Sequence, residues 1–127
     1  MLNGIPDNDL TSGVNYRVIR YADVLLMAAE AHNQLGNDVD AVDYLNQVRQ
    51  RVGMPARTST GNDLYEHILK ERRSELSCEG HRFFDLVRTR KASDVIIDFQ
   101  TGKHELFPIP QVEIDLAGGN WPQNPGY

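Results

Sequence analysis

Acidic and basic side chains are interspersed between residues 64 and 90, and their carboxylates are the first groups to consider for chemistry. Glycosidases use two carboxylic acids that face each other across an open cleft in different environments. Glu75, Glu79 and Asp85 are the candidate acids of this segment. Four arginines lie close to them in the sequence: Arg72, Arg73, Arg82 and Arg88. Because nearby positive charge keeps a carboxyl group ionised, the pattern favours a structural ion lattice over a general acid.

We therefore expect no catalytic residue in this chain, and we expect the charged side chains to hold helices together. The predicted ion lattice consists of Arg72, Glu75, Glu79, Arg82, Asp85 and Arg88.

Metal ligands are sparse in this sequence. His67 and Glu71 lie one helical turn apart and form a candidate metal pair. The HExxH motif is absent, and with Cys78 as the single cysteine no Cys-x-x-Cys pair exists. His67 is more typical of an exposed helix residue, and Cys78 of a small buried side chain. We expect neither a metal nor a cofactor.

Two aromatic residues near the end of the chain, Trp121 and Tyr127, could stack on the face of a sugar ring. The pattern around them favours a different role, in which they are anchors that pin an irregular tail to the helices. No ligand-binding residue can be named from these two positions.

The charged segment itself is predicted to form two helices that are broken at Gly80. Leu64, Ile68 and Leu76 recur on one helical face, and Arg72 falls on the same stripe. A guanidinium group on an apolar stripe is partly buried and needs charged partners. We therefore expect a clamp of two helices, held at a fixed angle by an apolar seam and by the ion lattice.

Two further helices precede this clamp. Residues 19–35 are apolar on two sides, which predicts a helix buried between neighbours. Residues 38–52 form the second helix, with Asp38 as its expected cap and an inner side of Ala41, Leu45 and Val48. The pair resembles one tetratricopeptide repeat in length and in its small residues. Because one such repeat cannot bury its faces alone, it must stack on the clamp and on helices elsewhere in a longer protein.

The ends of the chain have loop composition. Residues 1–18 are expected to be irregular or disordered, and residues 19–127 to form the folded domain. Residues 106–110 must be extended because of their prolines, a short helix follows from Pro110 to Leu116, and residues 117–127 are expected to fold back over the helices. The expected fold class is all-α: tetratricopeptide-like helical pairs with a long irregular C-terminal tail.

Charge and hydropathy exclude two classes of function. The net charge of −5 is unsuited to nucleic acid, which needs a basic face. No run of 18 apolar residues exists, so no segment is predicted to span a membrane. The residues after Met1 do not form a signal peptide, and we expect an export signal upstream of Met1.

Three blocks of this sequence resemble the C-terminal region of SusD/RagB-type proteins, the surface nutrient-binding lipoproteins of Bacteroidetes. The blocks are IRYADVLLMAAEAHNQLG, ERRSELSCEGHRFFDLVR and HELFPIPQVEID, followed by a terminal QNPGY. They occur in the expected order and cover nearly everything after residue 16. Members of this family are several times longer than 127 residues.

The resemblance implies non-covalent capture of an oligosaccharide or another nutrient at the outer membrane, by a protein that is lipid-anchored through an N-terminus absent from this chain. It also implies a partner, a SusC-like TonB-dependent transporter that the protein covers as a lid. In this family most sugar contacts come from loops outside the C-terminal segment.

Two other functions stay open at this point. The first is a stand-alone helical-repeat adaptor that binds another protein through the groove of its first helical pair. The second is a hydrolase that depends on Glu75 or Glu79. If the chain is a piece of a longer protein, bare helix faces predict self-association or low stability.

Overall fold

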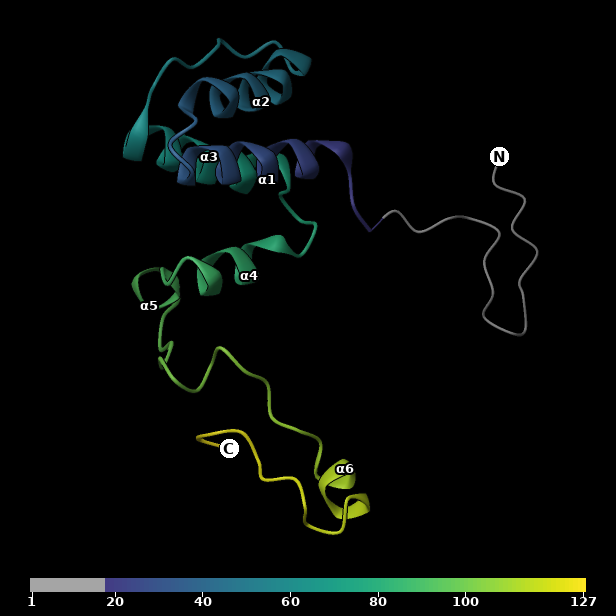
Figure 1. The fold of residues 1–127 in the computed structure, drawn as a ribbon. Helices are drawn as coiled ribbons and strands as arrows, with labels where there is room; N and C mark the ends of the chain where they lie inside the picture. Colours follow the sequence, from purple (N-terminus) through teal and green to yellow (C-terminus); the bar gives the residue numbers. More distant parts are fainter. Residues whose placement is uncertain (1–17) are drawn as a thin grey trace, which may run out of the picture. The chain divides into compact units, whose positions relative to one another are not determined.

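The computed structural model describes residues 18–127, and these residues form six helices and no β-strand. The all-α prediction is therefore confirmed. The chain divides into two compact units, Met1–Glu75 and Leu76–Tyr127, which are described separately (Figure 1). The prediction that residues 1–18 are irregular falls, except for Val18, outside the described residues. No helix within residues 18–127 has the length and apolar character needed to cross a membrane.

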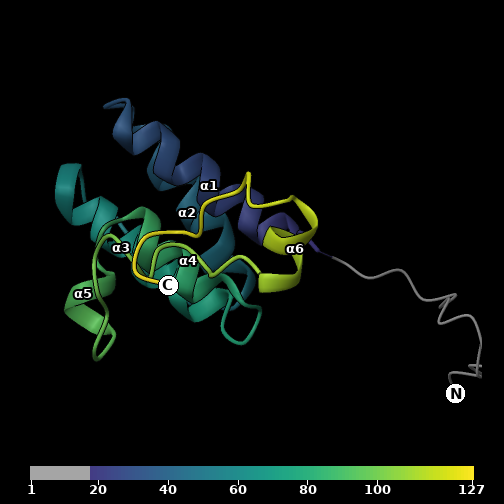
Figure 2. The ribbon, with the colours of Figure 1, turned by 90° about the horizontal axis from the view of Figure 1, so that it is seen from below.

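Unit 1 contains three helices: α1 is Tyr21–Gln34, α2 is Asp38–Arg51 and α3 is Gly61–Glu75. These bounds agree with the predicted helices to within a few residues. Helix α1 packs against both α2 and α3, as Figures 1 and 2 show, and α2 also contacts α3. The turn from α1 to α2 passes through Gly36 at a φ of +77°, a backbone conformation that glycine adopts without steric cost.

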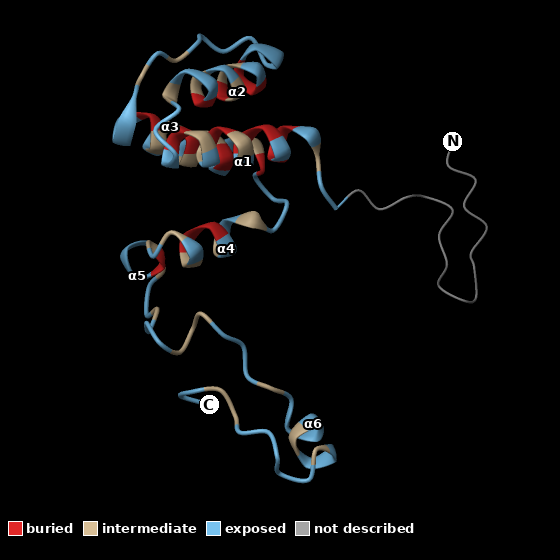
Figure 3. Ribbon diagram, in the orientation of Figure 1, coloured by how far each residue is buried: buried red, intermediate tan, exposed pale blue. Residues whose placement is uncertain are grey.

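The core of unit 1 lies where these three helices meet, and Figure 3 shows the buried residues on their facing sides. Seven side chains there are almost completely inaccessible: Leu26, Ala29, Ala41, Leu45, Val48, Leu64 and Ile68. Ala29 and Ala41 are small, which lets α1 and α2 approach closely, and burying each leucine or isoleucine stabilises the fold by about 1.5–3 kcal/mol. The predicted inner side of the second helix is confirmed.

The other side of α1 is exposed in this chain, and its predicted cover was helices elsewhere in a longer protein. Tyr21 is 72% exposed and Leu35 is 75% exposed, and Val24 is also exposed. The helix was expected to be buried on two sides, but α2 and α3 both cover the side that carries Ala22, Leu26 and Ala29. A second layer of helices would be needed to cover the remaining face.

Asp38 has a different role from the predicted one. Helix α2 begins at Asp38 itself, and the residue before it, Asn37, provides no side-chain cap. The Asp38 carboxylate accepts hydrogen bonds from the Gly61 backbone N–H at 2.6 Å and from Nδ2 of Asn33 at 2.8 Å. Because Gly61 is the first residue of α3, Asp38 links the beginning of α2 to the beginning of α3 and to the end of α1.

Unit 2 contains the shorter helices α4, His81–Arg88, α5, Ala92–Val95, and α6, Gln111–Leu116. Gly80 precedes α4 at a φ of +84°, as predicted, but α3 already ends at Glu75, so the break spans residues 76–80 and Leu76 lies outside the helix on which it was predicted. The prediction for Cys78 was wrong, because the side chain is exposed. Cys78 lies in the turn after α3 with a φ of +65°, so it is part of a loop and not of a packed helix face.

The C-terminal tail folds back along an extended segment of its own unit. The side chain of Gln123 accepts a hydrogen bond from the Ile109 N–H at 2.7 Å and donates one to the Ile109 carbonyl at 2.8 Å. Nδ2 of Asn124 donates to the Phe107 carbonyl at 2.7 Å. The tail was expected to fold over helices, but these contacts are with the extended segment before α6. The short helix predicted after Pro110 is confirmed as α6.

The two aromatic residues of the tail differ in their surroundings. The Tyr127 hydroxyl donates to the Leu106 carbonyl at 3.1 Å, and Nζ of Lys103 lies 4.9 Å from the centre of the Tyr127 ring. Trp121 is exposed. Tyr127 therefore anchors the tail as predicted, although to residues 103–106 and not to a helix.

Candidate ligand-binding site

A buried ion pair joins two helices in unit 1. Arg72 of α3 and Asp23 of α1 are both about 5% exposed, and Nη1 of Arg72 lies 2.8 Å from Oδ1 of Asp23. The predicted burial of Arg72 on the apolar stripe is confirmed. Burial removes the water that hydrates a guanidinium or carboxylate group. In this ion pair, each group compensates the other for that loss.

Glu75, at the end of α3, is contacted by two arginines. Nη1 of Arg20 lies 2.9 Å from Oε1 of Glu75, and Nη2 of Arg51 lies 2.7 Å from the same oxygen. Arg20 also donates to the Glu75 backbone carbonyl at 2.8 Å. Arg20 precedes α1 and Arg51 ends α2, so Glu75 connects all three helices of unit 1. A carboxylate that pairs with two guanidinium groups from different elements links those elements.

The remaining members of the predicted lattice belong to unit 2. Asp85 is buried, and within α4 its Oδ1 accepts a hydrogen bond from Nε of Arg88 at 2.9 Å and lies 2.8 Å from Nη2 of the same arginine. Glu79 and Arg82 are exposed. Arg72 and Glu75 belong to unit 1, so the lattice divides between the units, and its continuity across Gly80 stays a prediction.

The candidate metal pair has other partners. Nδ1 of His67 is hydrogen-bonded to the Ser59 hydroxyl at 2.8 Å. The Glu71 carboxylate forms an ion pair with Arg49, which is buried in α2. Within residues 18–127, no group of three or more His, Cys, Asp or Glu side chains is placed to hold a metal ion.

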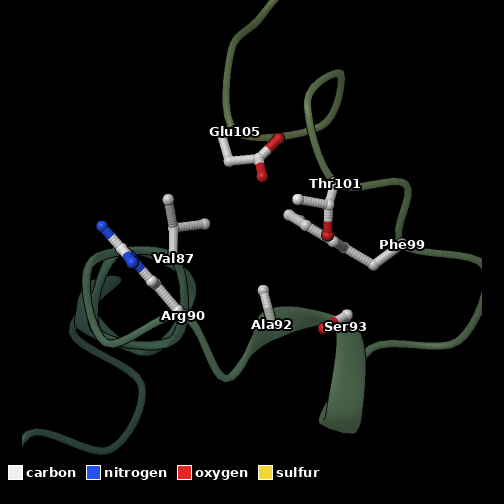
Figure 4. A pocket seen from close by; sticks show the side chains of 7 residues that line it. All are labelled: Val87, Arg90, Ala92, Ser93, Phe99, Thr101 and Glu105. Atoms are coloured by element: carbon white, nitrogen blue, oxygen red, sulfur yellow. The ribbon is translucent and has the colours of Figure 1, made fainter.

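Unit 2 contains a hollow of about 270 Å³ beside α4 and α5 (Figure 4). Seven residues line it: Val87, Arg90, Ala92, Ser93, Phe99, Thr101 and Glu105. In Figure 4, Phe99 and Thr101 face Val87 across the hollow, and the Glu105 carboxylate closes one side. The volume is close to the lower end of the range for small-molecule sites.

The side chains of this hollow are held by local contacts. The Phe99 ring packs edge-to-face on His104, with ring centres 5.6 Å apart, and Nδ1 of His104 accepts from the Gln100 N–H at 3.0 Å. Oε2 of Glu105 accepts from the Gly102 N–H at 2.8 Å. An aromatic ring, two hydroxyl groups and a positioned carboxylate around a small hollow can hold a small polyhydroxylated molecule, through ring stacking and hydrogen bonds.

None of these lining residues was predicted as a binding residue. They come from two short helices and from the loop after them, and their proximity depends on how that loop turns. The only sequence signal is a mixture of Ser, Thr, Phe and charged residues between positions 87 and 105.

The described residues form a helical scaffold in which α1, α2 and α3 enclose an apolar core. A model of the SusD family matches residues 2–104, and the chain belongs to that family. The predicted resemblance is thereby confirmed.

Two curated relatives from Formosa agariphila illustrate the similarity. SusD-like protein P38 is 42% identical over 92 residues, which is 65% of this chain and 18% of the relative. SusD-like protein P2 is 32% identical over 139 residues, which is 95% of this chain and 28% of the relative. The chain therefore spans between 18% and 28% of the length of these relatives.

The solved structures that resemble this chain belong to SusD-like proteins, as the sequence relatives do. A SusD homologue from Bacteroides thetaiotaomicron matches with a TM-score of 0.77 at 34% identity, covering 85% of this chain and 25% of the homologue. A SusD-like protein from Bacteroides fragilis matches with a TM-score of 0.73 at 32% identity, covering 87% of this chain and 25% of that protein. The tetratricopeptide-like helical fold is shared with these structures.

Proposed function

We propose that this chain is part of a SusD-like binding protein of the bacterial cell surface, which captures an oligosaccharide or another nutrient without chemical change. The observation that carries the proposal is the family match over residues 2–104. In this proposal the longer protein is held at the outer membrane by a lipid anchor. It delivers its ligand to a SusC-like TonB-dependent transporter.

Within this function, the hollow of unit 2 supplies a sugar contact in addition to those of the loops elsewhere in the longer protein. Phe99 offers a ring on which the C–H face of one sugar can stack, while Thr101 and Glu105 accept or donate hydrogen bonds to its hydroxyl groups. The volume of about 270 Å³ suits a single sugar residue at the end or side of a chain.

The sugar contact is tested by screening the 127-residue chain against a panel of immobilised oligosaccharides. We expect binding to at least one of them, and Phe99→Ala should weaken it by about tenfold, since stacking contributes roughly 1–1.5 kcal/mol. Ile97→Ala is the matched control, because Ile97 is 89% exposed and does not line the hollow. Equal binding by the wild-type chain and Phe99→Ala would remove the sugar contact from the proposal.

The partner is tested by affinity capture from the membranes of the producing cells, with the chain tagged at its C-terminus. Recovery of a TonB-dependent transporter supports delivery. Recovery of a soluble protein without any transporter favours the stand-alone adaptor instead, which would bind that protein through the groove of its first helical pair.

A further inference from the structure

A second hollow, separate from the one in unit 2, lies in unit 1 between α2, α3 and the loop of residues 53–60. It has a volume of about 360 Å³. The charged groups along its wall are Arg49, Arg57, Lys70, Glu71 and Glu75, and His67 and Ser74 are also part of the wall. We propose that this hollow binds a small anionic group, a carboxylate or a sulfate, and that Arg57 and Lys70 hold it.

Both acids of the hollow already have cationic partners within unit 1. Glu71 forms its ion pair with Arg49, and Glu75 forms ion pairs with Arg20 and Arg51. Their negative charge is therefore compensated by three arginines, and it is not available to compensate the other cations of the wall.

Arg57 and Lys70 are the two cations that remain. Neither side chain forms an ion pair with any residue between 18 and 127, and Nε of Arg57 is buried without a hydrogen-bond partner in that part of the chain. Buried donors of an arginine are nearly always satisfied, so this N–H is expected to have an acceptor when the site is in use. Arg57 and Lys70 therefore give this hollow an excess of positive charge, although the chain as a whole carries a net charge of −5.

The backbone of the loop at Arg57 is held by hydrogen bonds to a side chain of α2. The backbone N–H of Arg57 donates to Oδ1 of Asn46 at 2.7 Å, and Nδ2 of Asn46 donates to the backbone carbonyl of Arg57 at 2.9 Å. Nε of Arg49 donates to the Pro55 carbonyl at 2.9 Å, and Ser59 is hydrogen-bonded to His67. These contacts tie the loop to α2 and α3 at three points, which lowers the entropy cost of ordering a binding loop.

The chemistry of the wall selects an oxyanion. A guanidinium group presents its N–H donors in a planar fork that matches two oxygens of a carboxylate or sulfate, and an ammonium group adds a compact positive charge. In this hollow, Arg57 provides the guanidinium group and Lys70 provides the ammonium group. A neutral sugar offers no charge to either of them.

The proposal is tested by isothermal titration calorimetry of the 127-residue chain with sodium sulfate, sodium glucuronate and glucose at constant ionic strength. We expect sulfate or glucuronate to bind and glucose not to bind. Binding of glucuronate alone assigns the site to a carboxylate on a sugar, and binding of sulfate assigns it to a free or esterified sulfate group. This test does not depend on the proposed function, since inorganic sulfate is itself one of the probes.

Variants locate the site. Arg57→Gln should weaken anion binding by about tenfold or more, and Lys70→Gln should weaken it by a smaller factor. Arg73→Gln is the matched control, because Arg73 lies on α3 but is exposed and outside the hollow. Lys70 is exposed, so Lys70→Gln should leave the fold intact. It therefore tests the site even if Arg57→Gln does not fold. The proposal is overturned if neither anion binds, or if Arg73→Gln weakens binding as much as Lys70→Gln does.

Discussion

The two units of this chain are held together in different ways. In unit 1, three helices enclose a continuous apolar core, and ion pairs connect residues that are far apart in the sequence, such as Arg72 with Asp23. In unit 2, few apolar side chains are buried, among them Leu86 and Ala92, and side-chain amides of the tail bind the backbone of an extended segment.

This difference has a physical consequence for the stability of each unit. Burial of apolar surface is the main favourable contribution to folding, and unit 1 has most of it. Hydrogen bonds at an exposed surface contribute only about 1 kcal/mol each, because water competes for the same groups. We therefore expect unit 1 to determine the global stability of the chain, and unit 2 to open locally.

The largest effect is expected for Arg72→Ala. The substitution leaves the buried Asp23 carboxylate without its guanidinium partner, which should lower the free energy of unfolding by about 3–5 kcal/mol. Denaturant unfolding followed by circular dichroism measures this change. Arg51→Ala is the control, because Arg51 is exposed and its ion pair should contribute less than about 1 kcal/mol. A loss below about 1 kcal/mol for Arg72→Ala would mean that the pair behaves like a surface contact.

A matched pair of leucine substitutions compares the two units directly. Leu26→Ala in α1 removes a fully buried side chain and should cost about 2–5 kcal/mol. Leu116→Ala in α6 removes an exposed side chain and should change the stability by less than about 0.5 kcal/mol. Thermal or chemical unfolding of both variants under the same conditions gives the two values. Similar losses would show that α6 is packed in solution and that the contrast between the units is wrong.

The smallest global effect is expected for Gln123→Ala. The variant loses both hydrogen bonds to Ile109, so the Ile109 amide should exchange with solvent about five- to tenfold faster, while the global unfolding midpoint stays nearly constant. Gln100→Ala is a suitable control, because Gln100 is exposed and its contact with His104 is made by its backbone N–H. Unchanged exchange at Ile109 would mean that the tail does not protect this segment.

The helices of unit 1 were predicted well, because their buried residues recur at helical spacing in the sequence. Leu64, Ile68 and Arg72 recur at helical spacing, and this pattern alone indicated which face of α3 is buried. The partner of Arg72 could not be found in this way. Asp23 lies 49 positions earlier, and only the packing of α1 on α3 brings the two residues together.

Several features differed from the prediction or were not foreseen, and three of them show why. Cys78 was expected to be buried because of its neighbours, but the turn after α3 exposes it. The second apolar face of α1, around Tyr21 and Leu35, is exposed here, because α2 and α3 pack on the opposite side and its predicted cover was helices elsewhere in a longer protein. The hollow that contains Phe99 is formed by a loop whose path has no periodic signal in the sequence.

Native-state hydrogen exchange of the intact chain tests the contrast between the units most directly. The amides of Leu26, Leu45 and Ile68 should exchange only through global unfolding, so their exchange rates should follow the unfolding free energy as denaturant is added. The amides of Lys91 and Ile109 should exchange faster, with little dependence on denaturant, because they open locally. One common opening free energy for amides of both units would contradict the account, since unit 2 would then unfold only together with the core of unit 1.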